Sequence, residues 1–185
     1  MSSVRIITGR YRGRRLEVPP LPGLRPTTDT AREGLFNRLA ACLDWPQVRG
    51  LDVFAGTGAL GLELLSRGAA HLVSVESNRT LVQHLQQVRL KWPVPDWDIV
   101  QADAARWLDA ATLEADLILM DPPYNRPDKA ALVERAFQRS LLAPAGLLVL
   151  EHAAHETFAA QPHFIDQKQY GLVAFSFFSR IDYFA

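Results

Sequence analysis

The sequence is poor in the features that mark several large classes of protein. Its 185 residues include one cysteine, Cys42, so no disulfide can form within the chain. A lone thiol without a secretory signal is typical of a cytoplasmic protein, and we expect Cys42 to lie in the core. No apolar run approaches the roughly 18 residues that a membrane helix needs, so no membrane association is expected. His152, His155 and His163 lie close together, but without further cysteines or a helical H-E-x-x-H pattern they predict no metal site.

Lysine is absent from residues 1–40, and the charge is unevenly divided although the chain is neutral overall. The segment 1–40 holds eight arginines against three acids, a net charge of +5, and the remainder holds 12 basic and 17 acidic side chains, a net charge of −5. This asymmetry predicts a polyanionic partner, and arginine favours forked contacts to phosphate and stacking on bases. The alternative is a solvated charged face. We predict that nucleic-acid phosphates are bound by Arg10, Arg12, Arg14, Arg15 and Arg25. Arg25-Pro-Thr27 and Arg32, at the start of the next helix, could face either a cofactor or RNA.

The stretch Gly50-Leu-Asp-Val-Phe-Ala-Gly-Thr-Gly-Ala-Leu-Gly61 predicts a ligand site. Residues 51–55 are typical of a buried parallel strand and residues 59–67 of a helix, and the glycines between them form a G-x-G-x-x-G turn. Such a turn lets the backbone approach a ligand, to which the helix N-terminus offers free N–H groups. Asp52 would repel a pyrophosphate but attract a cation. A tight strand–helix turn without a ligand is the alternative.

The other elements predict an α/β fold in one domain, residues 1–185, with a six- or seven-stranded sheet. Further strands are expected at 72–76, 98–103, 116–121 and 146–151, and helices at 80–92 and 129–140. A capping box at Thr30-Ala-Arg-Glu33 predicts another helix start. Residues 164–170 and 172–180 predict a closing antiparallel hairpin, and residues 1–26 an Arg-rich hairpin with a proline-rich link. Lys168, Tyr170 and Arg180 are assigned to substrate contact or to a sheet edge.

The strand beginning at Asp116 ends in Asp121-Pro-Pro-Tyr124. The two prolines leave the sheet, so a carboxylate, a free carbonyl and an aromatic face are presented together beyond the strand. These groups suit a flat heterocycle that carries an NH₂ group, because they offer two acceptors for its hydrogens and a ring to stack on. A structural Asp-Pro-Pro turn would explain the prolines but not the aromatic residue.

Asp52 and the glycine turn resemble motif I of the Rossmann-like methyltransferases. A wider set of motifs resembles the RsmD family, whose members methylate the N2 amino group of a guanine in 16S ribosomal RNA. The resemblance covers nearly the whole chain and is carried by Gly9…Arg12-Gly-Arg14, Arg25-Pro-Thr27, Arg32-Glu-Gly-Leu-Phe-Asn37, Leu51–Gly61, Leu65-Ser-Arg-Gly-Ala69 and Asp121–Tyr124. Thr57 stands where the family often has serine, and Gln86 and Gln87 stand where an asparagine is expected.

The resemblance implies a seven-stranded, mostly parallel sheet with an antiparallel last strand and an N-terminal hairpin. It implies S-adenosylmethionine as the cofactor, with Glu76 accepting from the ribose and Asp103 from the adenine amino group. The implied cofactor-binding set is Asp52, Phe54, Ala55, Gly56, Thr57, Gly58, Glu76, Asp103 and Ala104, and the implied catalytic set is Asp121, Pro122, Pro123 and Tyr124. The implied substrate is 16S rRNA within a small-subunit particle, and a monomer is expected.

Three rival functions remain to be separated. A DNA or other RNA amino-group methyltransferase, acting on adenine N6 or cytosine N4, would share Asp-Pro-Pro-Tyr, although sequence-reading DNA enzymes usually need a further recognition domain. A nicotinamide oxidoreductase would use the glycines but neither Asp52 nor Asp121. A non-catalytic RNA-binding module would use the arginines and leave both motifs unexplained.

Overall fold

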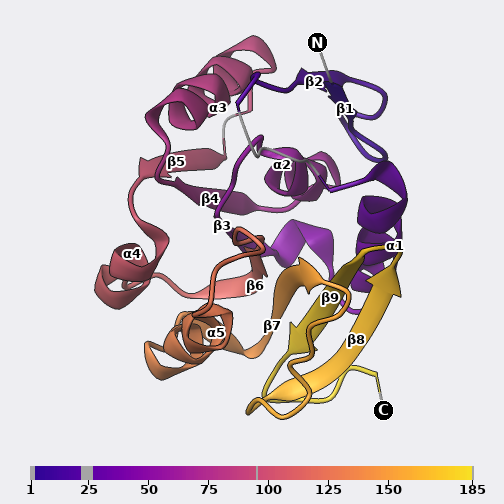
Figure 1. Ribbon diagram of the computed structural model, residues 1–185. Helices are drawn as coiled ribbons and strands as arrows, with labels where there is room; N and C mark the ends of the chain where they lie inside the picture. The colour runs from indigo at the N-terminus through magenta and orange to yellow at the C-terminus, as the bar shows by residue number, and fades with distance from the viewer. Residues whose placement is uncertain (1–2, 22–26, 95, 185) are drawn as a thin grey trace.

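The computed structural model describes residues 3–21, 27–94 and 96–184. These residues form an α/β fold in which helices cover a seven-stranded sheet on both faces, and a separate two-stranded sheet lies at the N-terminus (Figure 1). The predicted fold class is therefore confirmed. Arg25 lies outside the described residues.

The central sheet has the strand order β5-β4-β3-β6-β7-β9-β8. Its five parallel strands are β3 (Arg49–Val53), β4 (His71–Glu76), β5 (Trp97–Gln101), β6 (Ala115–Met120) and β7 (Leu142–Ala153). The last strand, β9 (Val173–Phe178), runs antiparallel to both β7 and β8 (Phe164–Tyr170), as the predicted closing hairpin requires. The strand order reverses between β3 and β6, and open α/β sheets bind ligands at the carboxyl ends of such strands.

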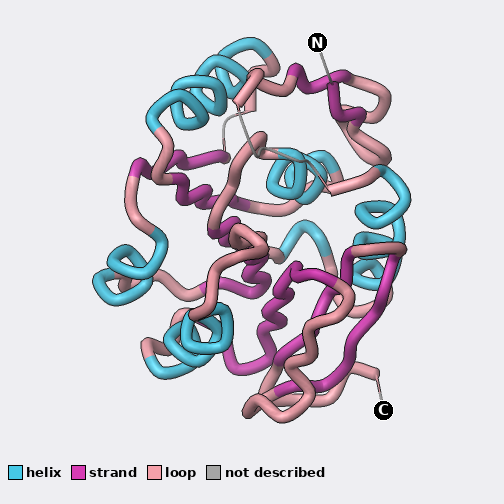
Figure 2. Tube along the Cα trace, viewed as in Figure 1, coloured by secondary structure: helices cyan, strands magenta, loops and turns pink. Residues whose placement is uncertain are grey.

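Two groups of helices enclose the sheet, one on each face (Figure 2). One face is covered by α1 (Asp29–Ala40), α2 (Ala59–Ser66) and α3 (Arg79–Lys91), and the other by α4 (Ala104–Ala110) and α5 (Lys129–Gln138). Side chains alternate along β6, because Leu117 and Leu119 pack with the first group and Ile118 and Met120 with the second. The Asp121 N–H still donates to the Val53 carbonyl at 3.3 Å, so the strand geometry continues to the site.

The N-terminal hairpin, formed by β1 (Ser3–Arg5) and β2 (Arg15–Glu17), is fixed to α2 by buried contacts. Glu63 is fully buried, and its carboxylate accepts the N–H groups of Ile7 and Thr8 at 2.9 and 3.0 Å. A Cβ atom on Gly9 would lie 1.8 Å from the Ser66 carbonyl oxygen, so only glycine allows this approach. The hairpin is therefore part of the folded domain.

The structure corrects two local predictions and adds one helix. Helix α1 begins at Asp29, and its N-cap is Thr28, whose side chain accepts from the Ala31 N–H at 3.3 Å. The capping box assigned to Thr30 is therefore wrong, because Thr30 already has helical backbone geometry. Cys42 is only partly buried and not in the core, since it lies just beyond α1. Helix α4 was not predicted, because its seven residues are too few to show a helical period.

A short 3₁₀ helix (Trp45–Gln47) connects α1 to β3. In the described parts of the chain, no helix combines the length and the apolar character that crossing a membrane requires.

Candidate active site

The glycine turn leaves β3 and leads into α2, as the sequence predicts. The backbone changes direction at Phe54, whose φ is 68°, and at Gly56 and Gly58, whose φ values are 55° and 80°. The N–H groups of Phe54 and Ala55 both donate to the carbonyl of Val75 on the neighbouring strand, at 3.1 and 3.0 Å. A positive φ at a residue as bulky as phenylalanine is strained and is found chiefly at functional sites.

Asp52 lies beneath this turn and is 1% exposed. Among the described residues its Oδ2 atom has no hydrogen-bond partner. Burial raises the pKa of Asp52 from 3.8 to about 7, an effect that the Gly61 N–H opposes and the charge of Glu76 increases. A buried carboxylate with a free oxygen is costly unless a cation approaches it. The residues of the site therefore fit S-adenosylmethionine, which carries an ammonium and a sulfonium group.

Glu76, at the end of β4, holds the glycine turn in place. Its Oε2 atom accepts the Gly56 N–H at 2.9 Å, and its Oε1 atom accepts the Asn78 N–H at 2.8 Å. This backbone role was not predicted from the sequence. It leaves lone pairs on both oxygens, because each carboxylate oxygen can accept more than one hydrogen bond, so it is compatible with binding a ribose diol.

The structure places the other cofactor-binding candidates along the same edge. Asp103 follows β5 and is the N-cap of α4, where its Oδ1 atom accepts the Arg106 N–H at 3.0 Å. Ala104 is buried at the first position of α4, and Thr57 is buried within the glycine turn. These residues lie next to Glu76, because the Ala102 N–H donates to the Glu76 carbonyl at 3.0 Å.

The Asp-Pro-Pro-Tyr segment lies at the carboxyl end of β6. This strand is the neighbour of β3, which carries Asp52, and the strand order reverses between the two. The Pro123 carbonyl accepts the Arg126 N–H at 2.9 Å, whereas the Pro122 carbonyl accepts no backbone hydrogen bond from the described residues. Tyr124 is 46% exposed. A carboxylate, a carbonyl and an aromatic ring are therefore presented together on one short loop.

Four acidic residues line this edge on the α1–α3 face of four neighbouring strands: Glu76, Asp52, Asp121 and Glu151. Burial raises the pKa of the Asp121 carboxyl well above its usual value, and the charges of Glu151 and Asp52 raise it further. An edge lined by four carboxyl groups offers no positive charge to a pyrophosphate, and each carboxyl that is ionised attracts a cation. This arrangement argues against a nicotinamide dinucleotide.

Three residues support this loop: Glu151, Thr27 and Lys129. Glu151 and Lys129 were missed from the sequence, and Thr27 was noted only as part of the Arg25-Pro-Thr27 motif. All three are buried, with 3%, 6% and 2% of their surface exposed. Glu151 ends the apolar run of β7, as Glu76 ends that of β4, and this pattern was a usable signal. The contacts of Thr27 with Glu151 and of Lys129 with Tyr124 and Glu156 arise only in the folded chain, so no local pattern indicated them.

The arginines of the hairpin are exposed but lie away from this edge. The turn of the hairpin packs on the end of α2 that is farther from the acidic edge, where the Arg10 N–H donates to the Ser66 carbonyl at 2.6 Å. The guanidinium groups of Arg10 and Arg14 lie 5.6 and 5.4 Å from the centre of the Tyr11 ring. The glycine turn lies at the opposite end of α2, and eight residues span about 12 Å. Arg12 and Arg15 are exposed on the same hairpin.

Several residues whose roles the sequence left undecided have structural roles. Arg32 is fully buried, and its guanidinium donates to the Arg5 carbonyl at 2.8 Å and to Asp29 at 2.6 Å. Tyr170 packs against Gly34, and Arg180 donates to the Leu142 carbonyl at 3.1 Å. Arg32 and Arg180 are therefore engaged by the protein itself.

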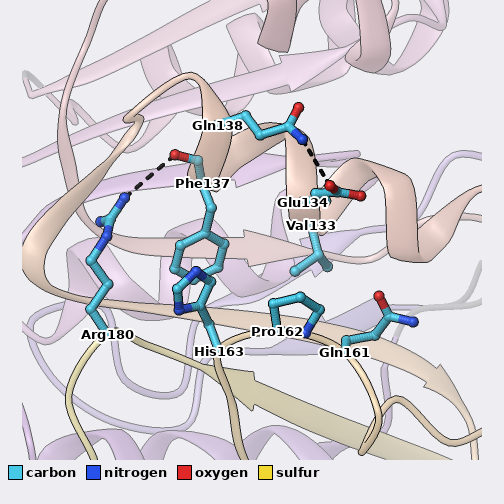
Figure 3. Close-up of a pocket in the computed structure, with 8 residues that line it drawn as sticks. All are labelled: Val133, Glu134, Phe137, Gln138, Gln161, Pro162, His163 and Arg180. Atoms are coloured by element: carbon cyan, nitrogen blue, oxygen red, sulfur yellow. Dashed lines mark hydrogen bonds between the residues drawn. The ribbon is translucent and has the colours of Figure 1, made fainter.

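A cavity of about 240 Å³ lies at the end of α5 that leads into β7 (Figure 3). In it the rings of Phe137 and His163 stack at 4.3 Å, and Arg180 donates to the Phe137 carbonyl. Because β7 starts here, the cavity lies at the amino ends of the parallel strands. It is therefore separate from the acidic edge.

The fold, the glycine turn and the acidic edge define this chain as an S-adenosylmethionine-dependent methyltransferase. The model of a family described as Conserved hypothetical protein 95 matches residues 4–179. The chain belongs to this family, the RsmD family, as the motifs indicated.

Similar proteins agree with this assignment. The ribosomal RNA small subunit methyltransferase D of Escherichia coli strain K12 is 36% identical over 180 residues, which cover 96% of this chain and 90% of that protein. The protein of the same name from Haemophilus influenzae is 32% identical over 152 residues, covering 80% and 78%. Among solved structures, yhhF of Escherichia coli, described there as a proposed methyltransferase, superposes with a TM-score of 0.84 at 34% identity, covering 98% of this chain and 99% of that one.

Proposed function

We propose that this protein transfers the methyl group of S-adenosylmethionine to the N2 amino group of a guanine in 16S rRNA of the bacterial small subunit. The observation that carries this proposal is the set of two acceptors and an aromatic ring, Asp121, Pro122 and Tyr124, on the strand next to Asp52, whose buried Oδ2 atom has no hydrogen-bond partner among the described residues. The names of the relatives support ribosomal RNA of the small subunit as the substrate class.

The cofactor fits the glycine turn and the acids beside it. Asp52 attracts the positive charge of the methionine part, and Glu76 accepts the ribose hydroxyls. Asp103 accepts from the adenine amino group, with Ala104 beside the ring. The remaining contacts come from the backbone of the turn, at Phe54, Ala55, Gly56, Thr57 and Gly58.

The protein accelerates the transfer mainly by orienting the target amino group. S-adenosylmethionine supplies a methyl group that is already activated on sulfur. The lone pair of guanine N2 is delocalised into the ring, and Asp121 and the Pro122 carbonyl localise it by accepting the two hydrogens. Tyr124 stacks on the base, and Pro123 closes the loop behind it. When the N–CH₃ bond has formed, N2 carries one proton too many, and the Asp121 carboxylate accepts it.

The phosphates of the RNA are bound at a distance from the base that reacts. The exposed arginines Arg10, Arg12, Arg14 and Arg15 bind backbone phosphates, and the sequence assigns the same role to Arg25. The hairpin turn and the acidic edge lie at opposite ends of α2, about 12 Å apart, so phosphates bound at the hairpin and the target base belong to nearby but distinct parts of the RNA. We expect the substrate to be 16S rRNA within a small-subunit particle. We expect the protein to act on it as a monomer in the cytoplasm.

Methyl transfer to small subunits and to deproteinised rRNA, both from a strain that lacks the enzyme, tests the proposal. The modified base should be a guanine methylated at N2. Asp121→Ala should lose more than tenfold in kcat, about 1.4 kcal/mol or more, and keep its affinity for S-adenosylmethionine. Asp109→Ala, an exposed change on α4, is the matched control.

Three outcomes would replace the proposal. Methylation mapped to adenine N6 or cytosine N4 would favour another amino-group methyltransferase. RNA binding without methyl transfer would favour a non-catalytic module. Parent-like kcat in Asp121→Ala would remove the amino-positioning role.

A further inference from the structure

Glu151 is the one carboxylate of the acidic edge for which the proposed chemistry has no use. It lies at the carboxyl end of β7 and is 3% exposed. Burial raises the pKa of Glu151, and hydrogen bonds from Thr27 and Tyr124 oppose this shift. An acid kept in this position at a cost in solvation calls for a role.

Both oxygens of Glu151 are engaged by residues far apart in the sequence. The Tyr124 hydroxyl donates to Oε1 at 3.2 Å, and the Thr27 hydroxyl donates to Oε2 at 2.6 Å. Thr27 is buried and directly precedes Thr28, the N-cap of α1. Thr27, which follows the Arg-rich hairpin and link in the sequence, therefore holds the Glu151 carboxylate from one side. On the other side, the same carboxylate holds Tyr124 of the Asp121–Tyr124 loop.

Tyr124 depends on such anchors, because 46% of its surface is exposed. Its carbonyl accepts a hydrogen bond from the buried Nζ of Lys129 at 2.6 Å, and the same Nζ donates to Glu156 at 2.7 Å. Lys129 thus fixes the backbone of the loop, whereas Glu151 fixes the far end of the Tyr124 ring. Burial and the charge of Glu151 raise the pKa of Tyr124, so its hydroxyl remains a donor.

Glu151 also lies beside Asp121. Met120 and Leu150 are register partners on the parallel strands β6 and β7, so Asp121 and Glu151 follow them as neighbours. Asp121 is faced by Glu151 from β7, by Asp52 from β3 and by Tyr124 of its own loop; Lys129 of α5 and Glu156 lie behind Tyr124.

We propose that Glu151 is a positioning residue for the methyl transfer, which holds Tyr124 in the orientation that stacks on the target base and sets a second carboxylate beside Asp121. Thr27 fixes Glu151 in that position. This inference rests on the proposed function of Asp121 and Tyr124. A residue that only filled space would leave the pH profile of the reaction unchanged.

The test compares Glu151→Gln with the parent protein in methyl transfer to small subunits. The amide keeps the shape but removes the charge and one of the two hydrogen-bond acceptors. We expect kcat to fall at least tenfold, while affinity for S-adenosylmethionine and KM for the RNA change less than threefold. Asp121 must be ionised to take up the proton that N2 releases, so activity is lost as the pH falls through its pKa. Removing the neighbouring charge lowers that pKa, and the acid limb of the kcat profile should move to lower pH.

Controls separate positioning from folding. Glu114→Gln makes the same chemical change on an exposed side chain just before β6 and should behave as the parent. Thr27→Val should lower kcat, and Thr27→Ser should restore it, because serine keeps the hydroxyl. The effects of Glu151→Gln and Tyr124→Phe should be non-additive in the double variant, since both alter the contact between residues 151 and 124.

A folded Glu151→Gln protein with the parent's kcat and pH profile would overturn the inference. If Asp121→Ala is inactive in the same assay, the proposed function survives that result. If Glu151→Gln does not fold, the two Thr27 variants decide, because equal kcat values for Thr27→Val and Thr27→Ser also overturn the inference.

Discussion

Replacing Asp52 with asparagine should stabilise the protein without cofactor and weaken its binding of S-adenosylmethionine. The pKa of Asp52 is raised by burial from 3.8 to about 7, so the folded state holds a proton that the unfolded state has lost. For a group with a raised folded pKa, stability is fully present below the unfolded value and is lost as the pH rises toward the folded value. The shift of about 3 units corresponds to roughly 4 kcal/mol lost between pH 4 and pH 7.

Cofactor binding should have the opposite dependence on pH. A cation binds the ionised form of Asp52, so affinity should be reduced about tenfold at pH 6 relative to pH 8. Asp52→Asn removes this titration and the favourable charge, and we expect its affinity at pH 8 to be weaker by about 1–3 kcal/mol. The site is thus less stable without cofactor because it is built to bind a cation.

Two measurements check this reasoning. Urea unfolding at pH 4, 6 and 8 gives the stability of the parent and of Asp52→Asn, and titration calorimetry at pH 6 and 8 gives their affinities. The difference between the two proteins isolates Asp52 from the ammonium group of the ligand, which also titrates. If Asp52→Asn is less stable than the parent at pH 8, or if both bind the cofactor with the same affinity and pH dependence, the assignment of Asp52 is refuted.

Three further predictions follow from other parts of the structure. Glu76→Ala should weaken cofactor binding by about 1–3 kcal/mol in calorimetry, because it loses ribose acceptors and frees the glycine turn; parent-like affinity would contradict this. Arg12→Ala with Arg14→Ala should raise KM for small subunits and flatten the salt dependence of binding by about one unit of log–log slope per phosphate contact, with cofactor affinity unchanged; an unchanged slope would make the hairpin a solvated face. Gly34→Ala should lower the free energy of unfolding by about 1–3 kcal/mol, because its Cβ would lie 2.2 Å from the Tyr170 ring, and Tyr170→Leu should relieve part of the loss.

The sequence by itself determined the glycine turn, the parallel strands and the Asp-Pro-Pro-Tyr loop. These features depend on local chemistry, because glycine permits positive φ at Gly56 and Gly58, and the consecutive prolines Pro122 and Pro123 have no N–H with which to continue the hydrogen bonding of β6. The continuous apolar runs of β6 and β7 reflect burial on both faces, which a parallel sheet requires. The boundaries were less well predicted, since the Thr28 cap and the short helix α4 have competing or weak signals.

Only the tertiary structure decided which of these residues meet. Thr27 and Glu151 are 124 positions apart and form one hydrogen bond at 2.6 Å, and Asp121 and Glu151 are neighbours only because β6 pairs with β7. Arg32 belongs to the same basic segment as Arg12, yet it is buried by contacts with Asp29 and the Arg5 carbonyl. Composition assigns both to one charged surface, but strand order and packing between distant segments place Arg32 in the interior and leave Arg12 exposed.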